Sequence, residues 1–204
     1  MKIFSKEVFV KSIHYDWVYY VLSVFAIIGL WSWAFGIFHR PKPYERLEIF
    51  VAAQIQDDSF CQEIEDEFGP EGLKLVESNQ ALPNDNAFQS KLQVVGYNAS
   101  DLLILPESIF ANLHFSEVFI EIDNTIKDNY LTGQENFYSH EGHDYGLLIR
   151  GGEKESWLDE YLNFDVNDNY YLFISGSSHN IGDKGIYETV DFDLALDVLS
   201  YLVR

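Results

Sequence analysis

The pattern of hydrophobic and polar positions divides the chain into two parts of different character. Residues 17–38, WVYYVLSVFAIIGLWSWAFGIF, form a run of 22 residues without a charged side chain. At about 1.5 Å per residue such a run makes a helix of roughly 33 Å, which matches the roughly 30 Å hydrocarbon core of a bilayer. Aromatic residues stand near both ends of the run, where their rings favour the membrane interface, and they are Trp17, Tyr19 and Tyr20 at its start and Trp31 and Trp33 near its far end. We therefore predict a transmembrane helix at 17–38.

A cleavable signal peptide is the alternative explanation for this run. The apolar region of a signal peptide is usually about 7 to 15 residues long and ends in small residues. Here the run is longer and leads into the basic, proline-containing sequence HRPKP at 39–43. We therefore prefer an anchor, with residues 1–16 as a cytoplasmic tail and residues 39–44 as a short linker. Three Lys or Arg residues flank the run on each side, so the positive-inside rule alone does not fix the orientation.

The residues after the linker alternate between short apolar runs and amphipathic segments, which predicts strands and helices in turn. The expected strands are at 47–53, 73–76, 102–105, 119–122, 145–149 and 170–174, and the expected helices are at 58–68, 87–95, 109–113 and 190–203. The run LLIL at 102–105 is apolar on both faces, which favours a central parallel strand covered by helices on each side. The β-α-β-α-β order of the first half predicts an α/β domain at 45–204 with a doubly wound, mostly parallel sheet.

The charge is divided as unevenly as the hydrophobicity. Residues 1–42 carry a net charge of +3 and residues 43–204 a net charge of −23, counting Lys, Arg, Asp and Glu. A domain this acidic repels phosphate backbones and anionic headgroups, which argues against nucleic acid and the membrane surface as its partners. The charge keeps the domain soluble, or attracts cations or a basic partner. Cys61 is the only cysteine, so no internal disulfide can form.

Candidate ligand-binding positions follow from the expected sheet. Ligands of open α/β sheets bind beyond the carboxyl ends of the strands. Gln54 follows the first expected strand, and Glu107 and Ser108 follow the third. We therefore expect these three side chains to face a crevice at that edge of the sheet.

Several passages carry a resemblance to a known family. They are LEIFVAA (47–53), SDLLILPESIF (100–110), VFIEIDNTI (118–126), HDYGLLI (143–149) and the expected helix near the C-terminus. In this order they resemble the first lobe of the extracellular solute-binding proteins of ABC transporters, which have the two-lobed periplasmic-binding-protein fold of type II. The resemblance covers most of residues 45–204. It implies a domain outside the cytoplasm, with the N-terminus of the chain in the cytoplasm.

The resemblance also has a gap. Family members place a second lobe between the strand that carries Tyr-Gly and the strand that returns to the first lobe, whereas here about twenty residues, 150–169, separate the two. Hinge closure of two lobes traps the ligand in such proteins. A single lobe is therefore not expected to capture a solute tightly. In a tethered transport receptor, Tyr145 would join Glu107 and Ser108 near the ligand.

The segment SHEGHD at 139–144 suggests metal binding. His140 and His143, with Glu141 and Asp144, could offer a metal two imidazoles and two carboxylates. A zincin, however, needs two histidines four positions apart on a helix, and here they are three apart with a glycine between them. A hairpin turn before a strand is the simpler interpretation of this segment.

Other polar or aromatic groups also have simpler structural interpretations. They are the oxygen-rich turn Asp165, Asn167, Asp168 and Asn169, the sequence Gly176-Ser177-Ser178-His179, the acidic pair Glu63 and Glu67, and the aromatic residues Trp157, Tyr161, Phe164, Tyr170 and Tyr171. The first lacks the glycine and distal glutamate of a calcium loop, and the second lacks the Gly-x-Ser-x-Gly pattern of an esterase. The pair Glu63 and Glu67 is explained by a solvent-exposed face of the expected helix at 58–68. The aromatic residues could stack on a sugar, but core packing explains them as well.

The sequence thus predicts a single-pass protein of the cell membrane with an extracytoplasmic, non-enzymatic, solute-binding-protein-like domain. It would act through a transporter or another membrane protein, or by weak binding of a small molecule. One alternative is a tethered receptor for an ABC transporter, and another is a metal-dependent enzyme that uses His140 and His143. We predict no catalytic residue, cofactor or metal site, and no nucleic-acid partner.

Overall fold

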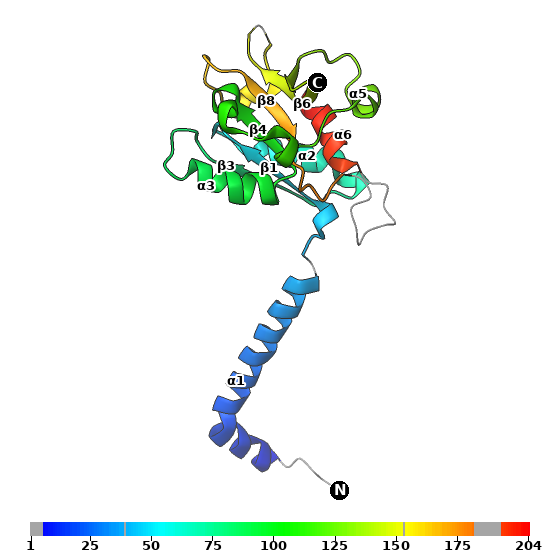
Figure 1. Cartoon of the computed structure of the whole chain (residues 1–204). Coiled ribbons are helices and arrows are strands. Elements are labelled where there is room, and N and C mark those ends of the chain that lie inside the picture. The colour runs from blue at the N-terminus through cyan, green and yellow to red at the C-terminus, as the bar shows by residue number, and fades with distance from the viewer. Residues whose placement is uncertain (1–5, 39, 153, 182–192) are drawn as a thin grey trace. The chain divides into compact units, whose positions relative to one another are not determined.

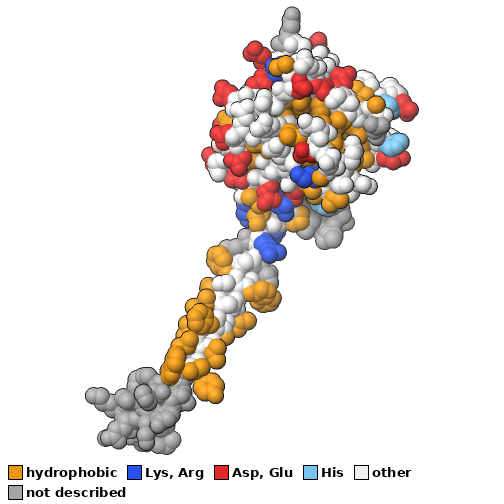
Figure 2. Space-filling view, turned by 90° about the vertical axis from the view of Figure 1, so that its left-hand side faces the viewer, with side chains coloured by type: hydrophobic (Ala, Val, Ile, Leu, Met, Phe, Trp, Pro, Cys, Tyr) orange, Lys and Arg blue, Asp and Glu red, His pale blue; other side chains and the backbone are white. Residues whose placement is uncertain are grey.

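The computed structural model describes residues 6–38, 40–152, 154–181 and 193–204, and it divides into two compact units, residues 1–40 and 41–204. In the first unit, α1 (Lys6–Phe38) is a helix of 33 residues. Its stretch Trp17–Gly36 has a mean hydropathy of 1.8 and none of its described side chains is buried. The chain therefore has one N-terminal helix that is long and apolar enough to cross a membrane, a criterion that a signal sequence also meets. Figure 2 shows the hydrophobic side chains along this helix.

The second unit is an α/β domain (Figure 1). Its strands and helices are β1 (Arg46–Val51), β2 (Gln54–Ile55), α2 (Ser59–Phe68), β3 (Leu75–Gln80), α3 (Phe88–Lys91), β4 (Leu102–Pro106), α4 (Phe115–Val118), α5 (Asn124–Tyr130), β5 (Phe137–His140), β6 (His143–Arg150), β7 (Leu162–Asn163), β8 (Tyr170–Ile174) and α6 (Leu194–Leu202). Six strands form the main sheet in the order β3-β1-β4-β8-β6-β5, and β2 pairs with β7 in a second, two-stranded sheet.

The main sheet is mixed, which corrects the expectation of a mostly parallel sheet. Strand β1 pairs in parallel with β3 and β4, whereas the pairs β4–β8, β8–β6 and β6–β5 are antiparallel. A tight turn at Glu141 and Gly142, both with positive φ, joins β5 to β6, and such a turn imposes an antiparallel pair. Strand β8 then returns between β4 and β6, opposite in direction to both. The parallel half is therefore limited to β3, β1 and β4.

Helices cover both faces of the sheet, as the buried central strand predicted. Alternate residues of the strands enter two separate hydrophobic clusters because successive side chains point to opposite faces. Ile49 packs in the cluster that contains α2 and α6, and its neighbour Phe50 packs in the cluster that contains α3 and α4. The strand β4 is buried along its whole length, so the run LLIL lies in the middle of the molecule. This arrangement positions the strand ends at which a ligand site is expected.

Local sequence explains how α2 begins and which face it buries. The Asp57 carboxylate accepts a hydrogen bond from the backbone amide of Ser59 at 2.9 Å, which satisfies one of the free amides at the helix start. Phe60, Ile64 and Phe68 recur every four residues and are buried against the sheet. The predicted helix at 58–68 is thus confirmed.

Several expected elements differ from the structure. The helix expected at 109–113 is a 3₁₀ helix at Glu107–Asn112. The second strand, expected at 73–76, is β3 at Leu75–Gln80. Residues 119–122 do not form a strand, because Phe119 makes only an isolated bridge with Ser175 and the next bonds, from the Ile120 and Ile122 amides, go to different segments of the chain. The closing helix begins at Leu194, and residues 190–192 of the expected helix lie outside the described residues.

Candidate functional site

A cavity of about 630 Å³ lies at the carboxyl ends of the parallel strands. Its walls include Ala52 to Gln54 after β1, Leu82 to Asn84 after β3, and Pro106 and Ser108 at the end of β4. Since β3 and β4 follow each other in the chain but flank β1 on opposite sides, this is the topological switch point of the parallel half. We call it the switch-point cavity. Its volume lies within the range of about 300–1,000 Å³ that is usual for small-molecule sites.

Two of the four residues that the sequence nominated line this cavity, and two do not. Gln54 and Ser108 are part of its wall. Glu107 is adjacent, but its carboxylate accepts a hydrogen bond from Asn169 Nδ2 at 2.7 Å, which ties it into the surrounding structure. Tyr145 is 6% exposed and packs against the ring of Phe115, in the hydrophobic cluster that contains α3 and α4. Tyr145 therefore lies outside the wall of the cavity.

The remaining wall comes from the segment that connects β6 to β8. We call residues 151–169 the return segment. In its second half it pairs with the extension of β1, where Gln54 lies opposite Asn163 in the β2–β7 ladder. Just before β8, the Asp168 carboxylate accepts a hydrogen bond from the Ser108 backbone amide at 3.3 Å. The segment thus spans the two strand ends that form the switch point.

The polar groups of the cavity wall are amides, a hydroxyl and acids. The side chains of Gln54, Asn84, Ser108 and Asn163 make no hydrogen bond with other described residues, so they can bond to a ligand or to water. Asp165 Oδ1 accepts hydrogen bonds from the backbone and side chain of Asn167, which fixes the turn before β8. No Lys, Arg or His is among the described residues of the wall. A neutral or cationic ligand therefore suits this cavity better than an anion.

Two aromatic rings support the floor of the cavity. Phe164 and Tyr170 lie with ring centroids 4.7 Å apart, and both are buried. Burial raises the pKa of Tyr170, which keeps its phenol neutral, and its hydroxyl accepts a hydrogen bond from the Asp165 backbone amide. These two rings thus belong to the core as well as to the cavity wall, as the packing interpretation of the aromatic residues expected. Val166, by contrast, is 84% exposed at the edge of the cavity.

Sequence reasoning missed Asn84 and Asn163 as wall residues. Asn84 follows β3, so the carboxyl-end rule finds it once the end of that strand is placed at Gln80. The strand end was misplaced because β3 lies at the edge of the sheet and most of its side chains are polar. Asn163 belongs to the two-residue strand β7, which is too short to give a recognisable pattern.

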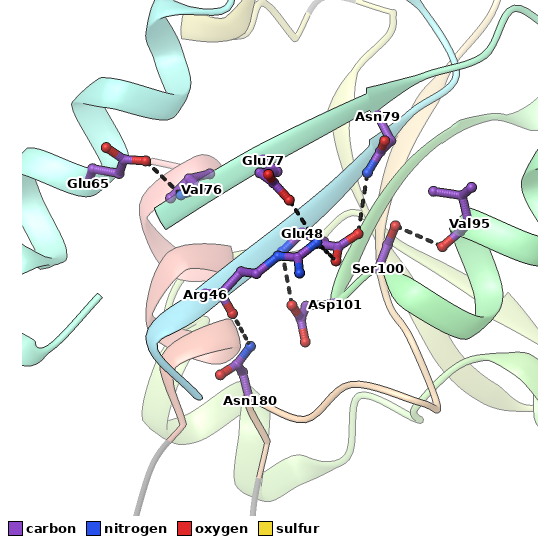
Figure 3. A network of polar contacts seen from close by, with 10 residues as sticks. All are labelled: Arg46, Glu48, Glu65, Val76, Glu77, Asn79, Val95, Ser100, Asp101 and Asn180. Carbon is purple, nitrogen blue, oxygen red and sulfur yellow. Dashed lines mark hydrogen bonds and ion pairs between the residues drawn. The ribbon is translucent and has the colours of Figure 1, made fainter. Parts of the chain in front are cut away.

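A second polar constellation lies at the opposite, amino-terminal end of β1 and β4 (Figure 3). Asp101 is 5% exposed and accepts hydrogen bonds from the Glu48 backbone amide at 3.0 Å and from Ser178 Oγ at 2.7 Å. Arg46 pairs with Glu77 at 2.7 Å and with Glu48. Burial raises the pKa of Asp101 and of Glu48. This network joins β1, β3, β4 and the loop after β8, and its role is to hold these elements together.

The two histidines of the SHEGHD segment lie opposite each other on the β5–β6 hairpin. The His140 ring packs on Phe115 with centroids 4.9 Å apart. His143 Nδ1 lies 2.9 Å from a carboxylate oxygen of Glu121. No group of three or more His, Cys, Asp or Glu side chains suited to a metal ion occurs within the part of the chain that the structure describes. The hairpin turn predicted for this segment is confirmed.

The other polar sequences have structural contacts. Ser178 bonds to Asp101, and the hydroxyls of Ser175 and Ser177 both donate to the Tyr97 carbonyl oxygen. Glu63 accepts a hydrogen bond from the Tyr161 hydroxyl.

No protein-family model matches this chain, and no curated protein matches its sequence.

Proposed function

We propose that the chain is a single-pass membrane protein whose domain binds a small polar solute in the switch-point cavity and does not catalyse a reaction. The observation that carries this proposal is the meeting of Gln54 and Ser108, from two different strand ends, in one cavity of about 630 Å³. Convergent polar groups in a cavity at a switch point are typical of ligand sites in α/β folds.

The topology supports a relationship to one lobe of the solute-binding proteins. Strand β8 returns antiparallel between β4 and β6, after a connection of only residues 151–169. In the proposed relationship, this return segment stands where the second lobe of the family would be inserted. It supplies the far wall of the cavity in place of that lobe. Because a short segment encloses less of a ligand than a second lobe does, we expect affinities in the micromolar range or weaker.

The surface of the domain favours a small ligand over an apolar protein partner. Among the described residues of the domain, Val94 and Val166 are the large hydrophobic side chains that are exposed. Acidic side chains are spread over the face visible in Figure 2. A transporter or another membrane protein that contacts this domain would therefore have to recognise polar and charged groups.

The apolar helix α1 supports attachment to the cell membrane. In the proposed arrangement, residues 1–16 lie in the cytoplasm, residues 17–38 cross the bilayer, and the domain lies outside the cytoplasm. Fractionation of cells tests the attachment, because an anchored chain of full length stays in the membrane pellet after an alkaline wash. Protease added to intact cells should degrade the domain. A soluble product that lacks the first 38 residues, or a domain protected from protease, would contradict this arrangement.

Ligand binding is tested with the full-length chain in detergent micelles, by calorimetry against a panel of small neutral, cationic and anionic solutes. The variants Gln54→Ala and Ser108→Ala should weaken binding of the active solute about tenfold, the effect of losing one or two hydrogen bonds. Gln89→Ala and Ser90→Ala, at exposed positions of α3, are matched controls. Absence of binding across the panel, or binding that ignores the first pair, would refute the site. Submicromolar affinity would instead favour the tethered transport receptor.

A further inference from the structure

The switch-point cavity has an excess of acceptors over donors. Asp165 and Asp168 each use Oδ1 in a hydrogen bond to the protein, while no described group donates to their Oδ2 atoms. A carboxylate only accepts hydrogen bonds, and an ammonium group only donates them. The free amide and hydroxyl side chains of Gln54, Asn84, Ser108 and Asn163 can adapt to either role. Asp165 is exposed and Asp168 is half-buried, so an ammonium group that binds these two carboxylates takes the place of water molecules.

The charge of the wall points in the same direction. Asp165 and Asp168 are its charged side chains, and the wall includes no cationic side chain among the described residues. Glu107 lies immediately beside it, at the same strand end as Ser108. The domain as a whole carries the net charge of −23, which attracts cations and repels anions at a distance. A ligand with a positive charge would thus be drawn to the cavity and would meet acceptors inside it.

Size argues for an organic cation over a metal ion. The cavity of about 630 Å³ is far larger than a coordination shell, and its carboxylates come from a turn that is partly exposed. The described residues also contain no group of three or more metal-binding acidic, His or Cys side chains. An aliphatic amine can fill such a space, with its carbon chain against the exposed Val166 and its ammonium groups at the carboxylates.

We propose that the ligand of the switch-point cavity is a small aliphatic amine, bound through its ammonium groups to Asp165 and Asp168. This inference rests on the proposed function, since it names the class of solute for the same site. It requires no second lobe, because the return segment itself carries both carboxylates.

Three probes of equal carbon length separate the effect of charge from that of size. They are putrescine with two ammonium ends, 1,4-butanediol with two hydroxyl ends, and succinate with two carboxylate ends. In calorimetry with the full-length protein in detergent, putrescine should bind at least about tenfold more tightly than either of the others. Its binding should weaken as salt is raised, because the carboxylates are partly exposed and therefore screened.

The variants Asp165→Asn and Asp168→Asn remove the charges while keeping an oxygen for the bonds that fix the turn and Ser108. Together they should weaken putrescine binding about tenfold or more. Asp128→Asn, at an exposed position on α5, is the control for loss of one charge elsewhere and should leave binding unchanged. Titration with CaCl₂ tests the metal alternative, because a metal site would let submillimolar calcium displace putrescine.

The outcomes separate this inference from the proposed function. Preference for putrescine that is lost in the two Asp variants supports both. A different result would be that butanediol or succinate binds as tightly as putrescine and loses binding in Gln54→Ala and Ser108→Ala. That result would support the site but refute an amine as its ligand. Displacement by calcium also overturns the amine. If none of the three probes binds and no other solute of the panel binds, both the site and its ligand class are refuted.

Discussion

Glu107 and Asn169 hold each other through two hydrogen bonds. The Glu107 backbone amide donates to the Asn169 carbonyl oxygen at 2.8 Å, and Asn169 Nδ2 donates to Glu107 Oε2 at 2.7 Å. One residue begins the turn after β4 and the other ends the return segment. The pair therefore fastens the far wall of the switch-point cavity to the carboxyl end of β4.

Removing the side-chain half of this pair should loosen the return segment. Asn169→Ala loses the bond to Glu107 Oε2, and we expect the free energy of unfolding to fall by about 1 kcal/mol, measured by urea denaturation in mild detergent. Hydrogen exchange of the Ser108 amide, which bonds to the neighbouring Asp168, should become faster. Asn167→Ala is the matched control, because the Asn167 side chain bonds only to Asp165 in the same turn. Equal effects of the two variants would contradict the fastening role of the pair.

Gly146 leaves room for a buried ring. A Cβ atom at this position of β6 would lie 2.5 Å from Phe173 Cε1, and Phe173 is fully buried. Gly146→Ala should therefore lower the free energy of unfolding by about 2 kcal/mol through overpacking. In the double variant with Phe173→Leu, the smaller side chain makes space for the new methyl group. The double variant should therefore lose about 1 kcal/mol less free energy of unfolding than the sum of the losses of the two single variants. A loss equal to that sum would refute the contact.

Strands β1 and β4 of the parallel half could be predicted because they carry a strong local pattern, whereas the polar edge strand β3 was misplaced. The run LLILP is apolar throughout and the run LEIFV is apolar except at Glu48, and their apolar residues are buried between two layers of helices. The carboxyl-end rule then placed Gln54 and Ser108 in one cavity, since it requires only the strand ends and their parallel direction. These two steps use information that is local in sequence.

The antiparallel half could not be predicted in the same way. The run YYLFI is equally apolar in either direction, so its insertion between β4 and β6 depends on tertiary contacts that are not visible in the run itself. Tyr145 was assigned to the ligand by resemblance, whereas the alternation of side chains along β6 directs it toward Phe115. Residues 119–122 have a strand-like pattern but meet only single hydrogen-bond partners, such as Ile120 with Ile174.

Asp101 should make the domain less stable as the pH rises. Burial raises its pKa above the ordinary 3.8, although hydrogen bonds from Ser178 and the Glu48 amide act in the opposite sense. The folded state disfavours the charged form of this carboxyl. Its contribution to the free energy of unfolding is therefore full below pH 3.8 and is lost as the pH rises through its pKa in the folded state. Urea denaturation between about pH 4 and 7 should show this decline.

The variant Asp101→Asn tests whether Asp101 causes this slope of the free energy of unfolding against pH. It removes the titrating group, so its free energy of unfolding should fall less over the same pH range than that of the unmodified chain. Some slope should remain, because burial also raises the pKa of Glu48 and of Asp197. Asp128→Asn removes the same charge from an exposed position and should leave the slope unchanged. A slope in Asp101→Asn that equals the slope of the unmodified chain would contradict the prediction.

His143 should hold its proton above the usual pH because of Glu121. The hydrogen bond between the imidazole and the Glu121 carboxylate, followed by the charge of that carboxylate, raises the pKa of His143 above 6.5. In an NMR titration of the ring, Glu121→Gln should lower this pKa toward 6.5. Glu141→Gln removes a charge that acts on His143 only through space and should lower it less.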